Sequence, residues 1–204
     1  MLVACIITYN DMPLVKDCIE SIQDKVDRII VIDGKYRDFP GEENYSTDGT
    51  LEYLNSLDVE ILFSYGLDEV EKRNCYLNEL KDGDICLNID SDEMLVGDIP
   101  ELTADIGIIQ IGEWGDRRRH RRSNRFFRYR EGLHYWGTHK MILDSKGRLF
   151  ANLDRVGKDY TSQKITEFEF LHNNHLRDHD RKKAKKKYYE ILVKREARVN
   201  EPAN

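Results

Sequence analysis

The segment CLNIDSDE, residues 86–93, places three carboxylates directly after a short apolar run: Asp90, Asp92 and Glu93. Carboxylates this close repel one another unless a positive group lies between them. Oxygen ligands of this kind suit Mg²⁺ or Mn²⁺, which proteins often hold with one or two carboxylates and substrate phosphates. The DSD spacing therefore predicts a metal site that also receives a diphosphate, although a solvated acidic turn has the same pattern.

The first hundred residues alternate between strand and helix patterns. The expected strands are 2–8, 26–33, 59–63 and 85–90, and the expected helices are 13–22, 50–57 and 67–80. Alternating strands and helices form a parallel sheet, which binds ligands at the carboxyl ends of its strands. Thr8, Asp33 and Asp90 are all expected at that edge.

After Pro100 the pattern changes to strands without helices between them. The expected strands are 106–114, 124–130, 133–143, 147–153 and 167–172, and a basic helix over 178–198 follows. The fold class expected is α/β with a mixed central sheet. We expect one domain over 1–204, in which 1–99 is the α/β half and 100–204 is β-rich with a C-terminal basic helix.

The composition suits a folded protein that is not a general nucleic-acid binder. The chain has 204 residues, of which 40% are hydrophobic, and a net charge of −6, which argues against general nucleic-acid binding. No apolar run reaches the roughly 20 residues of a membrane helix. The opening MLVACII lacks the features of a signal peptide, so a cytoplasmic location is expected. The four cysteines have no CxxC spacing and are expected as core thiols.

Two basic runs stand apart from the acidic total. RRRHRR, residues 117–122, is expected as a mobile loop between strands, and RKKAKKK, residues 181–187, is expected on the last helix. Each run is either a solvated face or a surface that attracts anionic partners. Such partners include a diphosphate, a lipid-linked phosphate and an anionic membrane surface, where the protein would be peripheral.

Four segments, in order, resemble those of family 2 glycosyltransferases with the GT-A fold. They are ACIITYND, IIVIDG with STDGT, EKRNCYLNEL, and GDICLNIDSDE, and together they span Val3 to Glu93. The later segments RFFRYREGLHYWGTHK and FLHNNHLR match more loosely. Two features depart from the family pattern: residues 35–45 are inserted before Ser46, and Lys140 follows His139 where many relatives carry glutamate. The insertion is expected to form a loop over the nucleotide pocket.

The resemblance implies a metal-dependent, inverting hexosyltransferase that uses Mn²⁺ or Mg²⁺. The donor would be a nucleotide diphosphate sugar, with UDP expected by family habit, and the acceptor a glycan, lipid or protein. Residues 1–99 would then bind the nucleotide-sugar, and residues 100–204 would face the acceptor. The implied nucleotide-binding residues are Thr8, Tyr9, Asn10, Asp33, Gly34, Arg73 and Asp90.

Asp92 would ligate the metal, Asp90 would hold it directly or through water, and the late His172 would be a third ligand. His175 and Arg177 would lie close to the diphosphate. An inverting transfer also needs a carboxylate base, and we rank Asp154, at a strand end in the acceptor half, ahead of Glu113. Asp116 and Asp159 are further candidates for that base.

Other functions stay open on the sequence alone. A DxD-type phosphatase would also use two aspartates after a strand, but its nucleophile normally ends the first strand. A nucleotidyltransferase needs a glycine-rich loop after the first strand, which is absent, and a glycosidase would leave the metal pattern unexplained. A non-enzymatic nucleic-acid-binding module would use the two basic runs.

Overall fold

The computed structural model describes residues 1–137, 141–152 and 155–173, together with residues 179, 182–184, 186–188 and 190–191. For residues 116–120 it describes the backbone alone. Residues 182–184, 186–188 and 190–191 are helical, in agreement with the expected basic helix. In the described part of the chain, no helix is both long and apolar enough to cross a membrane.

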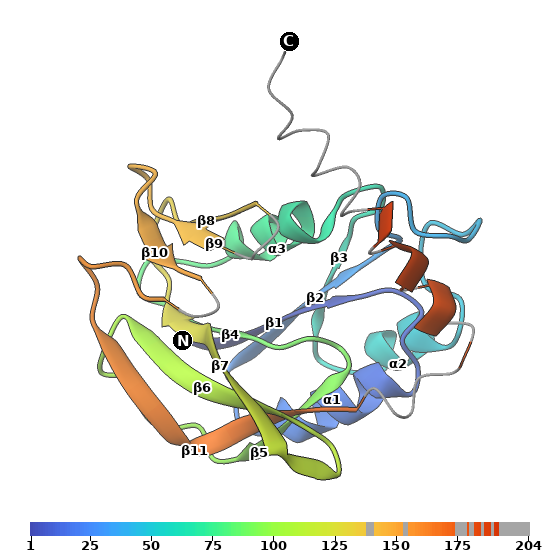
Figure 1. The fold of residues 1–204 in the computed structure, drawn as a ribbon. Coiled ribbons are helices and arrows are strands. Elements are labelled where there is room, and N and C mark those ends of the chain that lie inside the picture. The colour runs from blue at the N-terminus through green and yellow to red at the C-terminus, as the bar shows by residue number, and fades with distance from the viewer. Residues whose placement is uncertain are drawn as a thin grey trace.

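A curled, mixed sheet of eight strands forms the centre of the molecule, in the order β3-β2-β1-β4-β7-β6-β11-β5 (Figure 1). Its strands are β1 (Leu2–Thr8), β2 (Arg28–Asp33), β3 (Glu60–Phe63), β4 (Ile85–Asn88), β5 (Glu93–Gly97), β6 (Ile106–Glu113), β7 (Asp116–Arg128) and β11 (Ser162–His172). The first four are parallel neighbours, and β7 joins them to the rest by antiparallel pairing with β4 and β6. The sheet therefore contains strands from both halves of the sequence.

The helices cover the sheet on both faces, as the alternating pattern predicts. They are α1 (Leu14–Ile22), α2 (Thr50–Asn55) and α3 (Glu69–Leu77). Side chains of β1 alternate between two cores: Ala4 and Ile6 pack on the α1 side, whereas Cys5 packs on the α3 side. Helix α3 begins with a capping box in which the Asp68 side chain and backbone bond with Glu71.

A smaller antiparallel sheet covers the α3 face (Figure 1). It consists of β8 (His134–Trp136), β9 (Met141–Leu143) and β10 (Leu149–Ala151). Tyr135 of β8 and Phe150 of β10 are buried in the same core as Tyr76 of α3. This β-rich addition to an α/β sheet agrees with the fold class expected from the sequence.

Three expectations about the strands were wrong. Residues 117–122 belong to the long strand β7 and are not a loop between strands, because β7 continues its pairing with β6 as far as Asp116. The expected strand 133–143 is interrupted at Gly137, which has φ +66, so it contributes the two strands β8 and β9. Strand β5 was not expected, and it begins at Glu93, inside the acidic segment.

Candidate functional site

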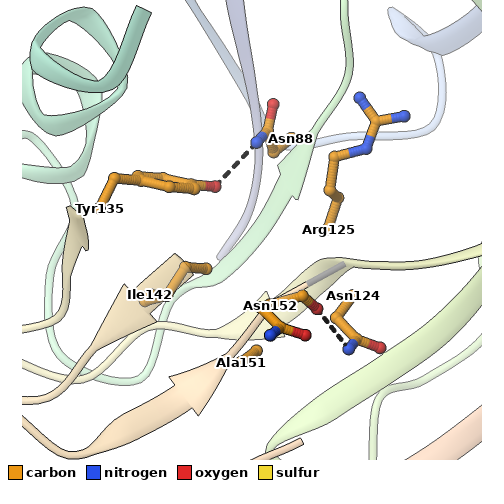
Figure 2. Close-up of a pocket in the computed structure, with 7 residues that line it drawn as sticks. All are labelled: Asn88, Asn124, Arg125, Tyr135, Ile142, Ala151 and Asn152. Atoms are coloured by element: carbon orange, nitrogen blue, oxygen red, sulfur yellow. Dashed lines mark hydrogen bonds between the residues drawn. The ribbon is translucent and has the colours of Figure 1, made fainter. Parts of the chain in front are cut away.

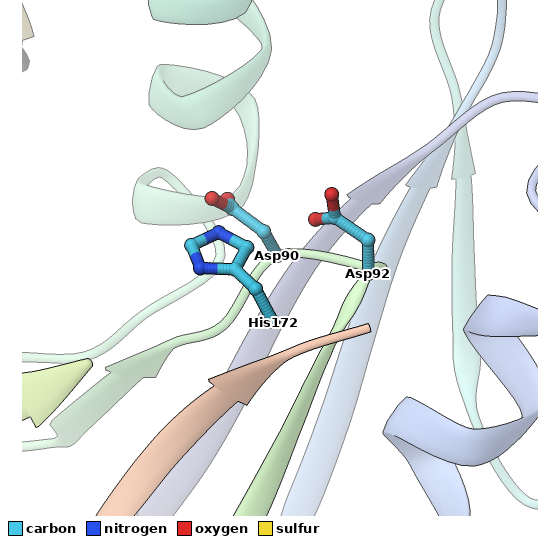
Figure 3. A group of neighbouring side chains, drawn as sticks. All are labelled: Asp90, Asp92 and His172. Carbon is cyan, nitrogen blue, oxygen red and sulfur yellow. The ribbon is translucent and has the colours of Figure 1, made fainter. Parts of the chain in front are cut away.

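The structure brings Asp90, Asp92 and His172 together at one edge of the central sheet (Figure 3). Each of the three offers one ligand atom, and these atoms all lie within 4.8 Å of one another. Asp92 and His172 are buried, and the side chain of Asp90 is 22% exposed. The sequence proposed these same three residues as metal ligands, and the fold places them close enough to share one cation.

Sheet pairing explains how residues so distant in sequence meet. Strand β11 lies between β5 and β6, and His172 at its end is the cross-strand neighbour of Glu93 on one side and Glu113 on the other. The backbone N–H of Asn173 donates to the carbonyl of Asp92 at 2.7 Å. The end of β11 is therefore tied to the acidic turn by both the sheet ladder and this additional bond.

Two buried arginines compensate the acidic cluster. Arg73 from α3 contacts Asp90 at 2.6 Å and Glu69 at 2.8 Å. Arg125 from β7 contacts Asp90 at 3.0 Å and Glu93 at 2.6 Å. Burial opposes the charge on each guanidinium, but its neighbours raise the pKa of both arginines above the ordinary value: Tyr76 and two carboxylates act on Arg73, and two carboxylates act on Arg125. Neighbouring carboxylates can therefore remain buried here, partly because two fixed positive charges lie among them.

Glu93 and His172 form a second contact within this cluster. Nε2 of His172 lies 3.1 Å from Oε1 of Glu93, and Glu93 also accepts the backbone N–H of Asp90 at 2.9 Å. Nδ1 of His172 is buried and has no hydrogen-bond partner among the described residues, while Oε1 of Glu113 lies 3.9 Å away. An imidazole nitrogen without a hydrogen-bond partner can donate its lone pair to a cation. Two carboxylates and one imidazole form a ligand set that suits Mn²⁺.

Asp33 occupies the corresponding position at the end of β2, with a different environment. It is fully buried and accepts hydrogen bonds from the backbone N–H and the hydroxyl of Ser46, at 3.1 and 2.5 Å. Burial raises the pKa of Asp33, while the bonds from Ser46 and the charge of Lys72 act in the opposite direction. The inserted residues therefore do not separate Asp33 from the STDGT segment in space.

Lys72 of α3 lies behind this aspartate. Its side chain is fully buried, and its ammonium group donates to the carbonyl of Gly34 and lies 4.4 Å from the centre of the Tyr36 ring. Burial lowers the pKa of Lys72 to about 8, and attraction to Asp33 limits that fall. Gly34 has φ +143, and a side chain there would clash with the carbonyl of Ser64, so the turn requires glycine.

The turn after β1 is joined to the same segment. Asn10 adopts φ 50, its backbone N–H donates to the Ser46 hydroxyl at 2.7 Å, and its side chain accepts from Thr47 at 2.7 Å. Thr8 and Tyr9 are buried, at 0% and 2% exposure. The structure therefore gathers the predicted nucleotide-binding residues of β1 and β2 into one connected group beside the acidic cluster.

The inserted residues 35–45 lie over this group. Phe39 is buried and meets the Tyr9 ring edge-on, with centroids 5.8 Å apart. The Tyr9 hydroxyl donates to the carbonyl of Glu43 at 2.7 Å. Tyr188 of the C-terminal helix packs on Phe39, with centroids 5.6 Å apart. The insertion and the C-terminal helix thus cover Tyr9 together.

Arg125 also lines a small pocket that lies between the central sheet and the smaller sheet (Figure 2). Its lining residues are Asn88, Asn124, Arg125, Tyr135, Ile142, Ala151 and Asn152. Asn88 donates to the Tyr135 hydroxyl at 2.7 Å, and Asn124 donates to the carbonyl of Asn152 at 2.6 Å. The pocket therefore presents polar groups next to a guanidinium that contacts the acidic cluster.

Of the two carboxylates ranked as candidate bases, the structure describes Glu113 but not Asp154. Glu113 ends β6 beside His172, and its side chain is 46% exposed, so its carboxylate is accessible from solvent. Asp154 lies outside the described residues, as do His139, Lys140, His175 and Arg177. Asp116 is described by its backbone alone, and Asp159 instead contacts Arg148 at 3.1 Å.

Sequence reasoning missed Arg125 and gave Glu93 no role. Both are buried, and they contact each other at 2.6 Å. A signal for Arg125 was available, since a cation directly before the apolar pair Phe126-Phe127 of a predicted strand requires a buried partner. The partner itself depends on the pairing of β7 with β4, which no short-range pattern reports.

Comparisons with known proteins identify no family for the chain. No protein-family model matches it, and no curated protein matches it. The crystal structure of S. aureus TarS 1–349 is 22% identical, with a TM-score of 0.41, over 57% of this chain and 37% of that chain. The same protein in complex with UDP gives 22% identity and a TM-score of 0.42, with the same coverage. Its complex with UDP-GlcNAc gives 21% and 0.41, over 57% of this chain and 36% of that chain. The chain thus spans little more than a third of those structures, and a likeness at this level assigns no activity.

Proposed function

We propose that the protein is a metal-dependent glycosyltransferase that transfers a sugar from a nucleotide diphosphate sugar, with UDP as the expected nucleotide. One observation carries the proposal. Asp90, Asp92 and His172 offer ligand atoms within 4.8 Å of one another, at the edge of an α/β sheet where ligands bind. The resemblance of the segments between Val3 and Glu93 to family 2 glycosyltransferases supports it.

Asp90, Asp92 and His172 would hold Mn²⁺ or Mg²⁺, which would neutralise the charge that develops on the departing diphosphate. Arg73 and Arg125 fix the carboxylate of Asp90 from two sides, at 2.6 and 3.0 Å. This rigid pairing keeps the ligand atoms in place before the donor arrives. Preorganised charge of this kind is usually the largest single contribution to transition-state stabilisation.

Asp33, with Thr8, Tyr9, Asn10 and Gly34, would bind the nucleoside of the donor. The acceptor, a glycan, lipid or protein, would approach from the opposite side, where Glu113 is exposed beside His172. In an inverting transfer, Glu113 would take the proton of the acceptor hydroxyl. Asp154 stays in the proposal as the alternative base, and variants of the two would distinguish them.

The direct test is calorimetric titration of UDP and GDP, each with and without Mn²⁺, into the wild-type protein and Asp92→Ala. We expect Mn²⁺-dependent binding of UDP in the wild type and a loss of at least about 100-fold in the variant. The control is Asp98→Ala, which removes an exposed aspartate from the same part of the chain. Failure of a folded wild type to bind either nucleotide would refute the proposal and favour the phosphatase or nucleic-acid hypotheses.

An anionic membrane surface is proposed as a further partner of the C-terminal helix. Lys182, Lys183, Lys186 and Lys187 are all exposed, whereas Tyr188 is buried, so the lysines lie away from the packed face. Each lysine near an anionic bilayer contributes about 1 kcal/mol. Sedimentation with phosphatidylglycerol vesicles should show salt-sensitive binding that is lost when the four lysines become glutamate. Equal binding of that variant, or no binding at low salt, would exclude the contact.

A further inference from the structure

The inserted loop has a fixed base and an exposed tip. At the base, the backbone N–H of Arg37 donates to the carbonyl of Leu67 at 3.0 Å, and its side chain contacts Glu71 at 2.5 Å. Residues 40–44 at the tip are exposed. Between the two, Phe39 is the buried side chain, at 8% exposure. The loop can therefore pivot about its base only if Phe39 leaves its site.

Phe39 lies between two aromatic neighbours from distant parts of the chain. Tyr9, at the end of β1, meets it from below, with ring centroids 5.8 Å apart. Tyr188 of the C-terminal helix covers it, with centroids 5.6 Å apart, and also lies 5.6 Å from Tyr36. Tyr188 is 4% exposed, and Ala184, one helical turn earlier, packs against the same cluster. Figure 1 shows the described part of this helix, in dark red, beside the blue loop that follows β2.

This cluster closes the group of residues to which the proposed function assigns the nucleoside. Thr8 and Asp33 are fully buried, and Tyr9 is 2% exposed. The Tyr9 hydroxyl is bonded to the tip of the loop through Glu43. The tip is also bonded to the base of the loop, where the backbone N–H of Lys35 donates to the carbonyl of Asn44 at 2.7 Å, so the buried ring of Phe39 anchors the loop as a whole. Under the proposed function, a nucleoside would contact these buried residues once the loop has moved away.

We propose that the C-terminal helix is a latch: Tyr188 holds Phe39, and through it the inserted loop, closed over the nucleotide pocket in the free protein. This inference rests on the proposed function for the identity of the ligand. Aromatic contacts and burial favour the closed state. A ligand that binds only the open state has its apparent affinity reduced by the fraction of molecules that are open. Release of the latch therefore regulates the same site.

The test combines Tyr188→Ala and Tyr188→Phe with Tyr65→Ala as the control. Tyr65 is an exposed aromatic residue that packs on Tyr45, at the outer side of the loop, with centroids 5.6 Å apart. Hydrogen exchange of residues 35–45 should be about 10-fold faster in Tyr188→Ala. It should change by less than about 2-fold in Tyr188→Phe, which keeps the ring, and in the control. The affinity for UDP with Mn²⁺ should rise about 10-fold in Tyr188→Ala alone.

The outcomes separate the latch from the proposed function. Unchanged exchange in a folded Tyr188→Ala protein would overturn the latch, whatever the nucleotide does. Faster exchange together with weaker UDP binding would also overturn it, because Tyr188 would then be part of the binding surface. Faster exchange in a protein that binds neither UDP nor GDP, as wild type or variant, would support the latch and refute the nucleotide.

Discussion

Asp33 and Asp90 follow neighbouring parts of one sheet, yet their charges are compensated in opposite ways. Asp33 receives two hydrogen bonds from Ser46 and has one amine, Lys72, nearby. Asp90 lies between the guanidinium groups of Arg73 and Arg125. The first arrangement surrounds a carboxylate whose pKa burial has raised, whereas the second places a carboxylate between two guanidinium groups. A strand end thus fixes where an acid lies, and the residues packed around it determine which groups balance its charge.

The largest effect on stability is expected among the arginines that surround Asp90. Replacement of Arg125 by methionine leaves Glu93 buried without its cation, and breaking a buried pair in this way costs about 3–5 kcal/mol. Urea unfolding would measure the loss, and Glu93→Gln combined with Arg125→Met should recover part of it. The exposed pair Lys16–Glu20 is the control, since Glu20→Gln should cost less than about 1 kcal/mol. Equal losses at the two pairs would contradict the distinction between them.

The next largest effect on stability is expected at Lys72, whose charge interacts with Asp33. Its folded-state pKa of about 8 lies below the ordinary value of 10.5, so the folded protein binds fewer protons than the unfolded chain between these values. Stability should therefore rise with pH across this window, by about 3 kcal/mol, relative to Lys72→Met. Unfolding of both proteins in urea at pH 7.5, 9 and 10.5 would measure the difference. Parallel pH profiles would show that the amine is not desolvated as described.

Ser46→Ala should give the smallest of the three effects. It removes the hydroxyl that donates to Asp33, at a cost of about 1–3 kcal/mol, and raises the pKa of Asp33 further. Because the lost bond stabilises the charged carboxylate, the cost should be largest above the pKa of Asp33 and shrink as the pH falls through it. Unfolding measured at pH 7 and at pH 4 tests that sign. A cost that grows in acid would reverse the interpretation of the Asp33 environment.

Local patterns predicted the first half of the fold well, for a physical reason. The apolar spacing of Leu14, Val15, Cys18, Ile19 and Ile22 is complete within α1, and all five are buried. Strands β1, β2 and β4 are short apolar runs that end at polar residues, so each can be found without knowledge of its neighbours. The grouping of Asp90 and Asp92 with His172 was instead expected from the family resemblance, because it depends on the pairing of β11 with β5 and β6.

The other strands were less predictable because they depend on long-range pairing. The basic run 117–122 is unfavourable as an isolated strand, and it is extended because β6 pairs with it. Strand β5 begins with Glu93, a residue of low strand propensity, and exists through its pairing with β11. The contacts of Arg125 with Glu93 and of Tyr188 with Phe39 were missed for the same reason, since each pair joins residues that are far apart in the sequence.

The register of β11 has a consequence for how the chain tolerates insertions and deletions. Between Lys164 and Glu169 the pairing of β11 with β6 shifts, and beyond this irregularity Glu169 to His172 pair in step with both β5 and β6. Because side chains alternate between faces, removal of one residue from 169–172 would turn the histidine to the opposite face. A change of length before the irregularity could be absorbed there. The register of the last four residues of β11 thus sets the position of His172, and the irregularity before them separates that register from the start of the strand.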